Sequence, residues 1–268
     1  MNYLNVPKKS LGQNFLIDKN IINKIIKLVN IDKNNTILEI GAGNGNLTSK
    51  IINTNVKKII AVEKDRKLSS FLKNRFKDTK NLEIINDDIF NLIQVENFGR
   101  NIIVFGNLPY NVSTQILASF ITINKWPPWY TNLIFMFQKE VADRILAKPG
   151  TKNFGRLSVL ANWRLEIKKC FDVSKNCFFP IPKVISTVLS FKPKNKDKFN
   201  IKNPKNIENV TRVLFSSRRK MINKNFLKLF KNNASVAADL KINLNKRPGE
   251  LSKENYYNIA IKYEKLFC

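Results

Sequence analysis

Three short groups of residues carry side chains suited to an adenosine-containing ligand, and each follows an apolar run. Gly41 and Gly43 belong to the GAGNG turn after TILEI, where the missing Cβ lets the backbone approach a ligand closely. Glu63 ends the next apolar run, about twenty residues on, where a carboxylate can accept both ribose hydroxyls. Asp87 and Asp88 end the third run, where a carboxylate can accept a hydrogen bond from the adenine amino group. Asp88 is preferred because an apolar pair follows it directly.

A fourth group, Asn107-Leu108-Pro109-Tyr110, resembles the loop of amino-methyltransferases that act on adenine. The lone pair of an exocyclic amine is delocalised into the ring, so the amine is a poor nucleophile. The Asn107 side-chain oxygen and the Leu108 carbonyl can hold its hydrogens and turn the lone pair toward a methyl carbon. Pro109 restricts the backbone, and Tyr110 offers a ring face to a flipped base. Such a transfer depends on placement more than on acid or base catalysis.

Alternating apolar runs and helical patterns are expected to position these groups. A helix is predicted over residues 19–29, and an amphipathic stretch follows the second run as far as Phe76. Strands are predicted at 36–40, 58–63, 81–87, 101–107 and 132–138. This alternation predicts a parallel sheet with crossover helices, whose carboxyl-terminal edge would bring the four groups together.

The pattern changes after Gly155. Residues 156–173 and 184–192 have strand character with no clear helix between them, which predicts antiparallel strands at one edge of the sheet. Residues 192–206 form a charged, proline-containing linker, and helices are predicted at 210–230 and 253–266. We therefore expect a domain over residues 1–196 and a small helical domain over 197–268.

The composition favours a polyanionic partner. Lys and Arg number 47 against 20 Asp and Glu, giving a formal net charge of +27, although a compositional bias toward Lys accounts for part of it. The chain has no His, which excludes His bases and His-ligated metals. Three unpaired cysteines, no signal peptide and no long apolar run predict a cytoplasmic protein with no metal site and no membrane contact.

With these residues assembled, the chain resembles the rRNA adenine N6,N6-dimethyltransferases, and among them the bacterial small-subunit enzymes. The matching segments run in order through nearly the whole chain: KKSLGQNFLID, EIGAGNGNLT, AVEKD, NDDIF, NLPYNVSTQIL, MFQKEVADRI, FGRLSV, FFPIPKVISTV and FSSRRKMINKNF. Ala42 and Ile181 stand where many family members have Pro.

The resemblance implies an α/β fold with a Rossmann-like class I methyltransferase sheet and S-adenosyl-L-methionine as cofactor. It implies that Asn14 and Leu16 line the cofactor site, together with Gly41, Gly43, Glu63, Asp88 and Asn107. It also implies that Phe178 holds the target base opposite Tyr110, and that the basic segment Arg218, Arg219 and Lys220 lies on an RNA-facing helix. The expected substrate is 16S rRNA in the assembling small ribosomal subunit, dimethylated on adenine N6 by a monomeric enzyme.

Three other activities remain as alternatives. A related 23S rRNA adenine N6-methyltransferase shares the motifs, although Leu108 and the FSSRRK segment favour the small-subunit branch. An adenine DNA methyltransferase would need a target-recognition domain that the sequence after residue 196 is too short to supply. A ribosome-assembly or transcription factor could keep the fold and bind RNA without turnover.

Overall fold

The computed structural model describes residues 13–93, 98–195 and 198–268. Within them, a seven-stranded sheet has the order β4-β3-β2-β5-β6-β9-β7. Its strands are β2 (Thr36–Ile40), β3 (Lys58–Val62), β4 (Leu82–Ile85), β5 (Ile102–Gly106), β6 (Tyr130–Gln138), β7 (Leu165–Val173) and β9 (Ser186–Pro193). A separate antiparallel pair is formed by β1 (Phe15–Leu16) and β8 (Phe178–Phe179).

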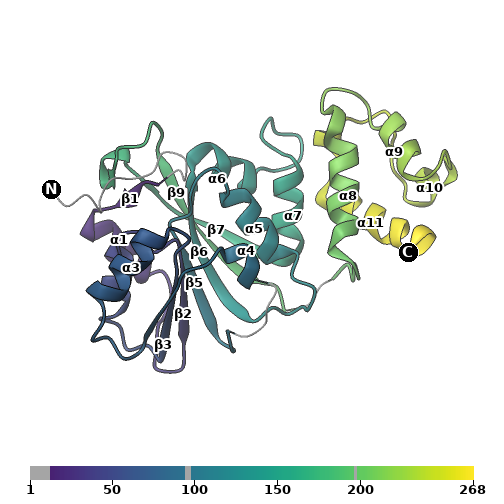
Figure 1. Cartoon of the computed structure of the whole chain (residues 1–268). Helices are drawn as coiled ribbons and strands as arrows, with labels where there is room; N and C mark the ends of the chain where they lie inside the picture. Colours follow the sequence, from purple (N-terminus) through teal and green to yellow (C-terminus); the bar gives the residue numbers. More distant parts are fainter. Residues whose placement is uncertain (1–12, 94–97, 196–197) are drawn as a thin grey trace. The chain divides into compact units, whose positions relative to one another are not determined.

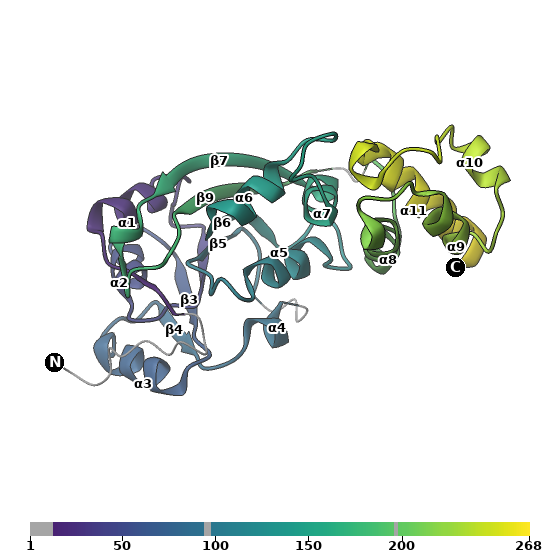
Figure 2. The same ribbon diagram turned by 90° about the horizontal axis from the view of Figure 1, so that it is seen from above.

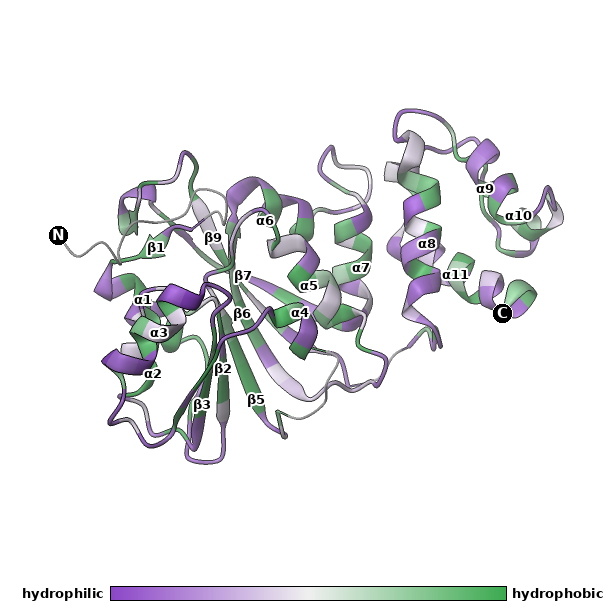
Figure 3. Ribbon diagram, viewed as in Figure 1, coloured by the Kyte–Doolittle hydropathy of each residue, from purple (hydrophilic) through white to green (hydrophobic). Residues whose placement is uncertain are grey.

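The predicted parallel sheet is confirmed. Strands β4, β3, β2, β5 and β6 pair in parallel, and β9 pairs antiparallel with β6. Every residue of β2 and β5 is buried, as expected for central strands covered on both faces, and Figure 3 shows their apolar character. Helices α1 (Lys19–Ile26) and α2 (Asn46–Ile51) cover one face of the sheet, and α4 (Ile89–Leu92) and α5 (Ser113–Ile121) cover the other (Figure 2).

The remaining helices are α3 (Arg66–Arg75), α6 (Lys139–Leu146), α7 (Arg156–Arg164), α8 (Pro204–Leu214), α9 (Asn223–Leu229), α10 (Ser235–Asp239) and α11 (Lys253–Phe267). Short 3₁₀ turns are η3 (Lys175–Cys177), η4 (Phe215–Ser217) and η5 (Pro248–Glu250). Figure 1 shows the course of the chain through these elements.

One predicted strand is a helix. Residues 156–164 form α7, and only 165–173 form the strand β7. Side chains all round α7 are buried, so its sequence lacks the apolar stripe that marks an amphipathic helix. Its last residue, Arg164, is buried between the rings of Trp126 and Trp163 and donates to the carbonyls of Ile121 and Ile123 at 3.1 and 2.9 Å.

The chain divides into two compact units. The first holds the described residues up to Ser119 with Pro128–Ala142 and Ile167–Pro193. The second holds Phe120–Pro127, Asp143–Glu166 and Lys194–Cys268, so α7 groups with the C-terminal helices. The second unit thus includes two segments that precede residue 194 in the sequence. The domain boundary between residues 196 and 197 stays a prediction.

Candidate functional site

Most of the predicted site residues line one cavity in the first unit, at the carboxyl ends of the parallel strands. They are Asn14, Gly41, Gly43, Glu63, Asp88, Asn107, Leu108, Pro109 and Tyr110. Phe15, Val62, Ile89, Phe90, Val112 and Ile116 add apolar walls. Carboxylates set among apolar walls match an adenosine group, whose ring is apolar on its faces and whose ribose and amino groups are polar.

The glycine turn leaves room between two loops of the cavity. Gly41 has φ of +69°, and a Cβ added there would point toward the Asn107 carbonyl oxygen and Pro109 Cδ, at 3.9 and 4.0 Å. Gly43 has φ of +58°, and a Cβ there would come within 3.0 Å of the Phe15 ring. Both positions require the left-handed conformation that glycine adopts without strain. A side chain at position 41 would therefore enter the gap that a ligand would fill.

Glu63 holds this turn in place. Its Oε2 accepts a hydrogen bond from the Gly43 N–H at 2.8 Å, and its Oε1 accepts one from the Asp65 N–H at 2.8 Å. Burial raises the pKa of Glu63 above its ordinary value, although these two hydrogen bonds oppose the increase. Each carboxylate oxygen can accept a second hydrogen bond, so the side chain can still receive a pair of ribose hydroxyls.

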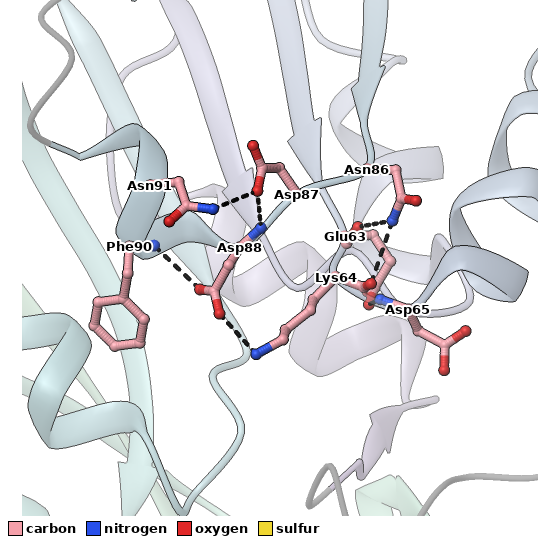
Figure 4. A network of polar contacts seen from close by, with 8 residues as sticks. All are labelled: Glu63, Lys64, Asp65, Asn86, Asp87, Asp88, Phe90 and Asn91. Carbon is pink, nitrogen blue, oxygen red and sulfur yellow. Dashed lines mark hydrogen bonds and ion pairs between the residues drawn. The ribbon is translucent and has the colours of Figure 1, made fainter.

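An ion pair joins the ends of the second and third parallel strands (Figure 4). Lys64 Nζ lies 2.7 Å from Asp88 Oδ2, while Asp88 Oδ1 accepts from the Phe90 N–H at 3.1 Å. Burial opposes ionisation of Asp88, yet these two hydrogen bonds together hold its pKa below the ordinary value. Asn86 donates to the Glu63 carbonyl at 2.8 Å and so ties the two strand ends together.

Asp87 is the other carboxylate that ends the third strand. Its Oδ1 accepts from the Asp88 N–H and from Asn91 Nδ2, at 2.6 and 2.8 Å. Figure 4 shows Asp87 and Asp88 pointing away from one another. Both line the cavity.

The loop at residues 107–110 follows β5 directly. Asn107 Nδ2 donates to the Asn14 carbonyl at 2.9 Å, which orients the amide and leaves its oxygen as an acceptor. Leu108 is buried, and a Cβ on Gly106 would lie 2.5 Å from its Cδ2, so a side chain at position 106 would displace that of Leu108. The Val112 N–H donates to the Pro109 carbonyl at 3.1 Å and closes the loop onto α5.

Tyr110 is tethered from a distant part of the chain. Its hydroxyl lies 2.6 Å from the hydroxyl of Ser186, a fully buried residue that begins β9. Burial raises the pKa of Tyr110, and the bond with Ser186 partly offsets this effect. The ring therefore has a fixed position at the cavity.

Two expected site residues lie in the hydrophobic core instead. Phe178 is 1% exposed and packs in the same cluster as Leu16, which is 5% exposed. The two residues lie opposite each other in the β1–β8 pair, and their side chains project from the same face of it. Neither the Phe178 ring nor the Leu16 side chain lines the cavity. Phe178 thus lies outside the lining of the cavity, and its stacking on a base stays a prediction. Phe179, its neighbour, is 52% exposed.

The basic segment at residues 218–220 lies in the second unit and is not helical. The predicted helix over 210–230 is interrupted by η4, and residues 218–220 form a turn before α9. Arg218 donates to the carbonyls of Lys152 and Phe154, so it braces the loop before α7. Arg219 and Lys220 are exposed.

Among the residues that the structure describes, no cluster of three or more His, Cys, Asp or Glu side chains could hold a metal ion. None of the helices in that part of the chain combines the length and apolar character needed to cross a membrane.

Several residues of the site escape sequence reasoning. Lys64 follows Glu63 directly, but nothing in the sequence shows that its side chain turns toward Asp88. Asn86 and Ser186 act through bonds to residues 23 and 76 positions away. Gly106 carries a local signal, since glycine is unusual within an apolar strand.

Solved structures share this fold. A dimethyladenosine transferase from Plasmodium falciparum superposes with a TM-score of 0.75 at 27% identity, covering 94% of this chain and 98% of that one. The 23S rRNA methyltransferase ErmE superposes with a TM-score of 0.65 at 19% identity, covering 93% and 99%, a likeness that shows the fold alone. The sheet order and the residues at its strand ends thus define a Rossmann-like methyltransferase.

Sequence comparison identifies the family. The profile of the family described as ribosomal RNA adenine dimethylase matches residues 5–265. The ribosomal RNA small subunit methyltransferase A of Pelagibacter ubique is 46% identical over 259 residues, with 97% of each chain covered. This chain belongs to the ribosomal RNA adenine dimethylase family.

Proposed function

We propose that this protein transfers methyl groups from S-adenosyl-L-methionine to adenine N6 in small-subunit (16S) rRNA, producing N6,N6-dimethyladenine during ribosome maturation in the cytoplasm. The observation that supports this most strongly is one shared cavity. The loop at 107–110, suited to an exocyclic amine, lies there with Gly41, Glu63 and Asp88, which are suited to an adenosine group. The family, and relatives named as small-subunit enzymes, favour this substrate.

The cofactor would be held by residues already described. Glu63 would accept hydrogen bonds from the ribose hydroxyls, and Asp88 would accept one from the adenine amino group. The turn at Gly41 and Gly43 would lie against the rest of the cofactor. When bound, S-adenosyl-L-methionine supplies a methyl group on a positively charged sulfur, which is electrophilic without further activation. Lys64 bonds Asp88 Oδ2 and the Phe90 N–H bonds Oδ1, and either oxygen can accept a second hydrogen bond from the adenine amino group.

The loop at 107–110 prepares the amine. Asn107 donates its NH₂ to the Asn14 carbonyl, which leaves the side-chain oxygen to accept one amine hydrogen. The Leu108 carbonyl accepts the other, and Tyr110 supports the ring of the base. Two acceptors on the hydrogens localise the nitrogen lone pair, which then points away from them. After the first transfer one hydrogen remains, so a single acceptor holds the amine for the second.

A methyl-transfer assay tests this function. Small ribosomal subunits lacking the modification, large-subunit RNA and duplex DNA are offered side by side, and the nucleosides are analysed by mass. We expect N6,N6-dimethyladenosine in small-subunit RNA only. Methylation of large-subunit RNA instead would support the 23S-type alternative, and binding without any methylation would support a non-catalytic assembly factor.

Asn107→Ala separates chemistry from binding. The contact of the Asn107 side chain with the amine strengthens as the lone pair localises. Its removal should therefore lower turnover at least about tenfold while cofactor affinity changes little. The matched control is Asn53→Ala, because Asn53 also donates to one carbonyl, that of Ser49 at 2.9 Å, but lies outside the cavity. A loss confined to KM would contradict the proposed role of Asn107.

A further inference from the structure

Exposed apolar side chains gather in one part of the first unit. Among the described residues, seven large hydrophobic side chains are exposed, and five of them lie at position 17 or between positions 179 and 185. We call these five the apolar rim: Ile17, Phe179, Ile181, Val184 and Ile185. Phe179 is 52% exposed and Ile181 61% exposed. Concentrated exposure of this kind marks a binding surface more often than scattered single residues do.

The apolar rim adjoins the cavity, because both ends of its segment are tied to cavity residues. Phe179 lies directly opposite Phe15 in the β1–β8 pair, so the two side chains project from the same face, and Phe15 lines the cavity. At the other end, the Ser186 hydroxyl lies 2.6 Å from that of Tyr110. Figure 1 shows the green segment that leads into β9 lying beside β1.

The backbone holds the rim outward. The Lys139 N–H donates to the Ile185 carbonyl at 2.9 Å, and the Ile17 N–H donates to the Cys177 carbonyl at 2.8 Å. Pro182 is buried while Ile181 and Lys183 on either side of it are exposed, and the segment ends at the buried Ser186. The exposed side chains are therefore fixed at the surface by an anchored segment.

Charge around the rim indicates what covers it. Lys183 is exposed within the segment. Lys19, two residues after Ile17, and Lys175, four residues before Phe179, are also exposed. Apolar side chains interleaved with lysines match single-stranded nucleic acid, in which base faces are apolar and phosphates are negative.

We infer that the apolar rim binds the unpaired nucleotides that flank the target adenine. This inference rests on the proposed function, because a base that enters the cavity must leave its stack and carry its neighbours to the cavity edge. Phe179 offers a ring for stacking, and the aliphatic residues cover the faces of adjacent bases. The rim thus favours unpaired RNA over a duplex, whose bases are already stacked.

Equilibrium binding of a single-stranded oligoribonucleotide of about ten residues, measured against salt, tests the inference. The double variant Ile181→Ser/Val184→Ser should bind about tenfold more weakly at every salt concentration, with an unchanged log–log slope, because it removes apolar contact only. Lys183→Gln should instead reduce the slope by roughly 0.7, the contribution of one phosphate contact on a single strand. Leu266→Ser is the matched control, since its 46% exposure lies between the 61% of Ile181 and the 42% of Val184 and it belongs to the second unit, far in sequence from the basic segment at 218–220.

Thermal melting and S-adenosylhomocysteine binding should be unchanged in all variants, because the altered side chains are exposed. Unchanged oligonucleotide affinity in the double variant would overturn the inference, as would an equal loss for duplex RNA. The binding assay needs no methyl transfer, so the two proposals fail separately. Oligonucleotide binding that depends on the rim, without any methylation, would contradict only the proposed function. Methylation by the wild type, together with unchanged oligonucleotide affinity in the double variant, would contradict only the role of the rim.

Discussion

Replacing Glu63 by alanine is expected to weaken S-adenosyl-L-methionine binding by about 1.5–3 kcal/mol, or roughly 10- to 150-fold, the scale of hydrogen bonds to a charged group. The structure gives two reasons for the loss. The carboxylate is the acceptor available to the ribose hydroxyls, and its oxygens hold the N–H groups of Gly43 and Asp65, each at 2.8 Å. Without it, two N–H groups lose their partner and the glycine turn loses its tether. Glu63→Gln should be intermediate, because one acceptor oxygen remains.

Calorimetry with S-adenosylhomocysteine measures the affinity, and a thermal melt establishes that each variant is folded. The matched control is Glu83→Gln on β4, because Glu83 is half-exposed, pairs with Lys58 at 2.7 Å and lies outside the cavity. We expect wild-type affinity for this control. A folded Glu63→Ala protein that binds with wild-type affinity would refute the assignment of Glu63 to the cofactor site.

Three further predictions concern positioning, pH and RNA binding. Ser186→Ala and Tyr110→Phe should each lower kcat/KM, and the double variant should be no worse than either alone, because both remove the same 2.6 Å bond; additive losses would argue against positioning. Burial raises the pKa of Glu39 from 4.5 to about 8, so the folded protein keeps a proton that the unfolded chain releases, and stability is lost as pH rises between these values. Denaturant unfolding should show this loss, up to about 5 kcal/mol, in the wild type, and Glu39→Gln should lose less over the same pH range, with only the contribution of Glu63 remaining; parallel pH profiles would contradict it. Arg219→Ala should reduce the salt dependence of RNA binding without lowering the melting temperature, whereas Arg218→Ala should lower the melting temperature because its bonds to two carbonyls are lost; equal melting temperatures would contradict the bracing role of Arg218.

The placement of Gly41, Glu63 and Asn107 at one edge could be predicted because it depends on local pattern. Each follows an apolar run, and parallel strands present their carboxyl ends at the same edge of the sheet. The seven-stranded order and the antiparallel partner of β6 agree with that prediction. Periodicity and chain direction were enough for this part of the fold.

Only the tertiary structure decided which neighbours meet. Because side chains alternate along the β1–β8 pair, Phe178 points into the core and Phe179 points outward. This orientation depends on pairing with residues more than 160 positions away. Helix α7 looked like a strand because it is buried all round, and burial on every side erases the helical period. The charge of Arg218 is visible in the sequence, but the carbonyl groups of Lys152 and Phe154 that it bonds are not. The sequence by itself determined the chemistry at the strand ends, since that depends on residue type and local period; the contacts that hold and surround this chemistry depend on long-range packing, which no local pattern records.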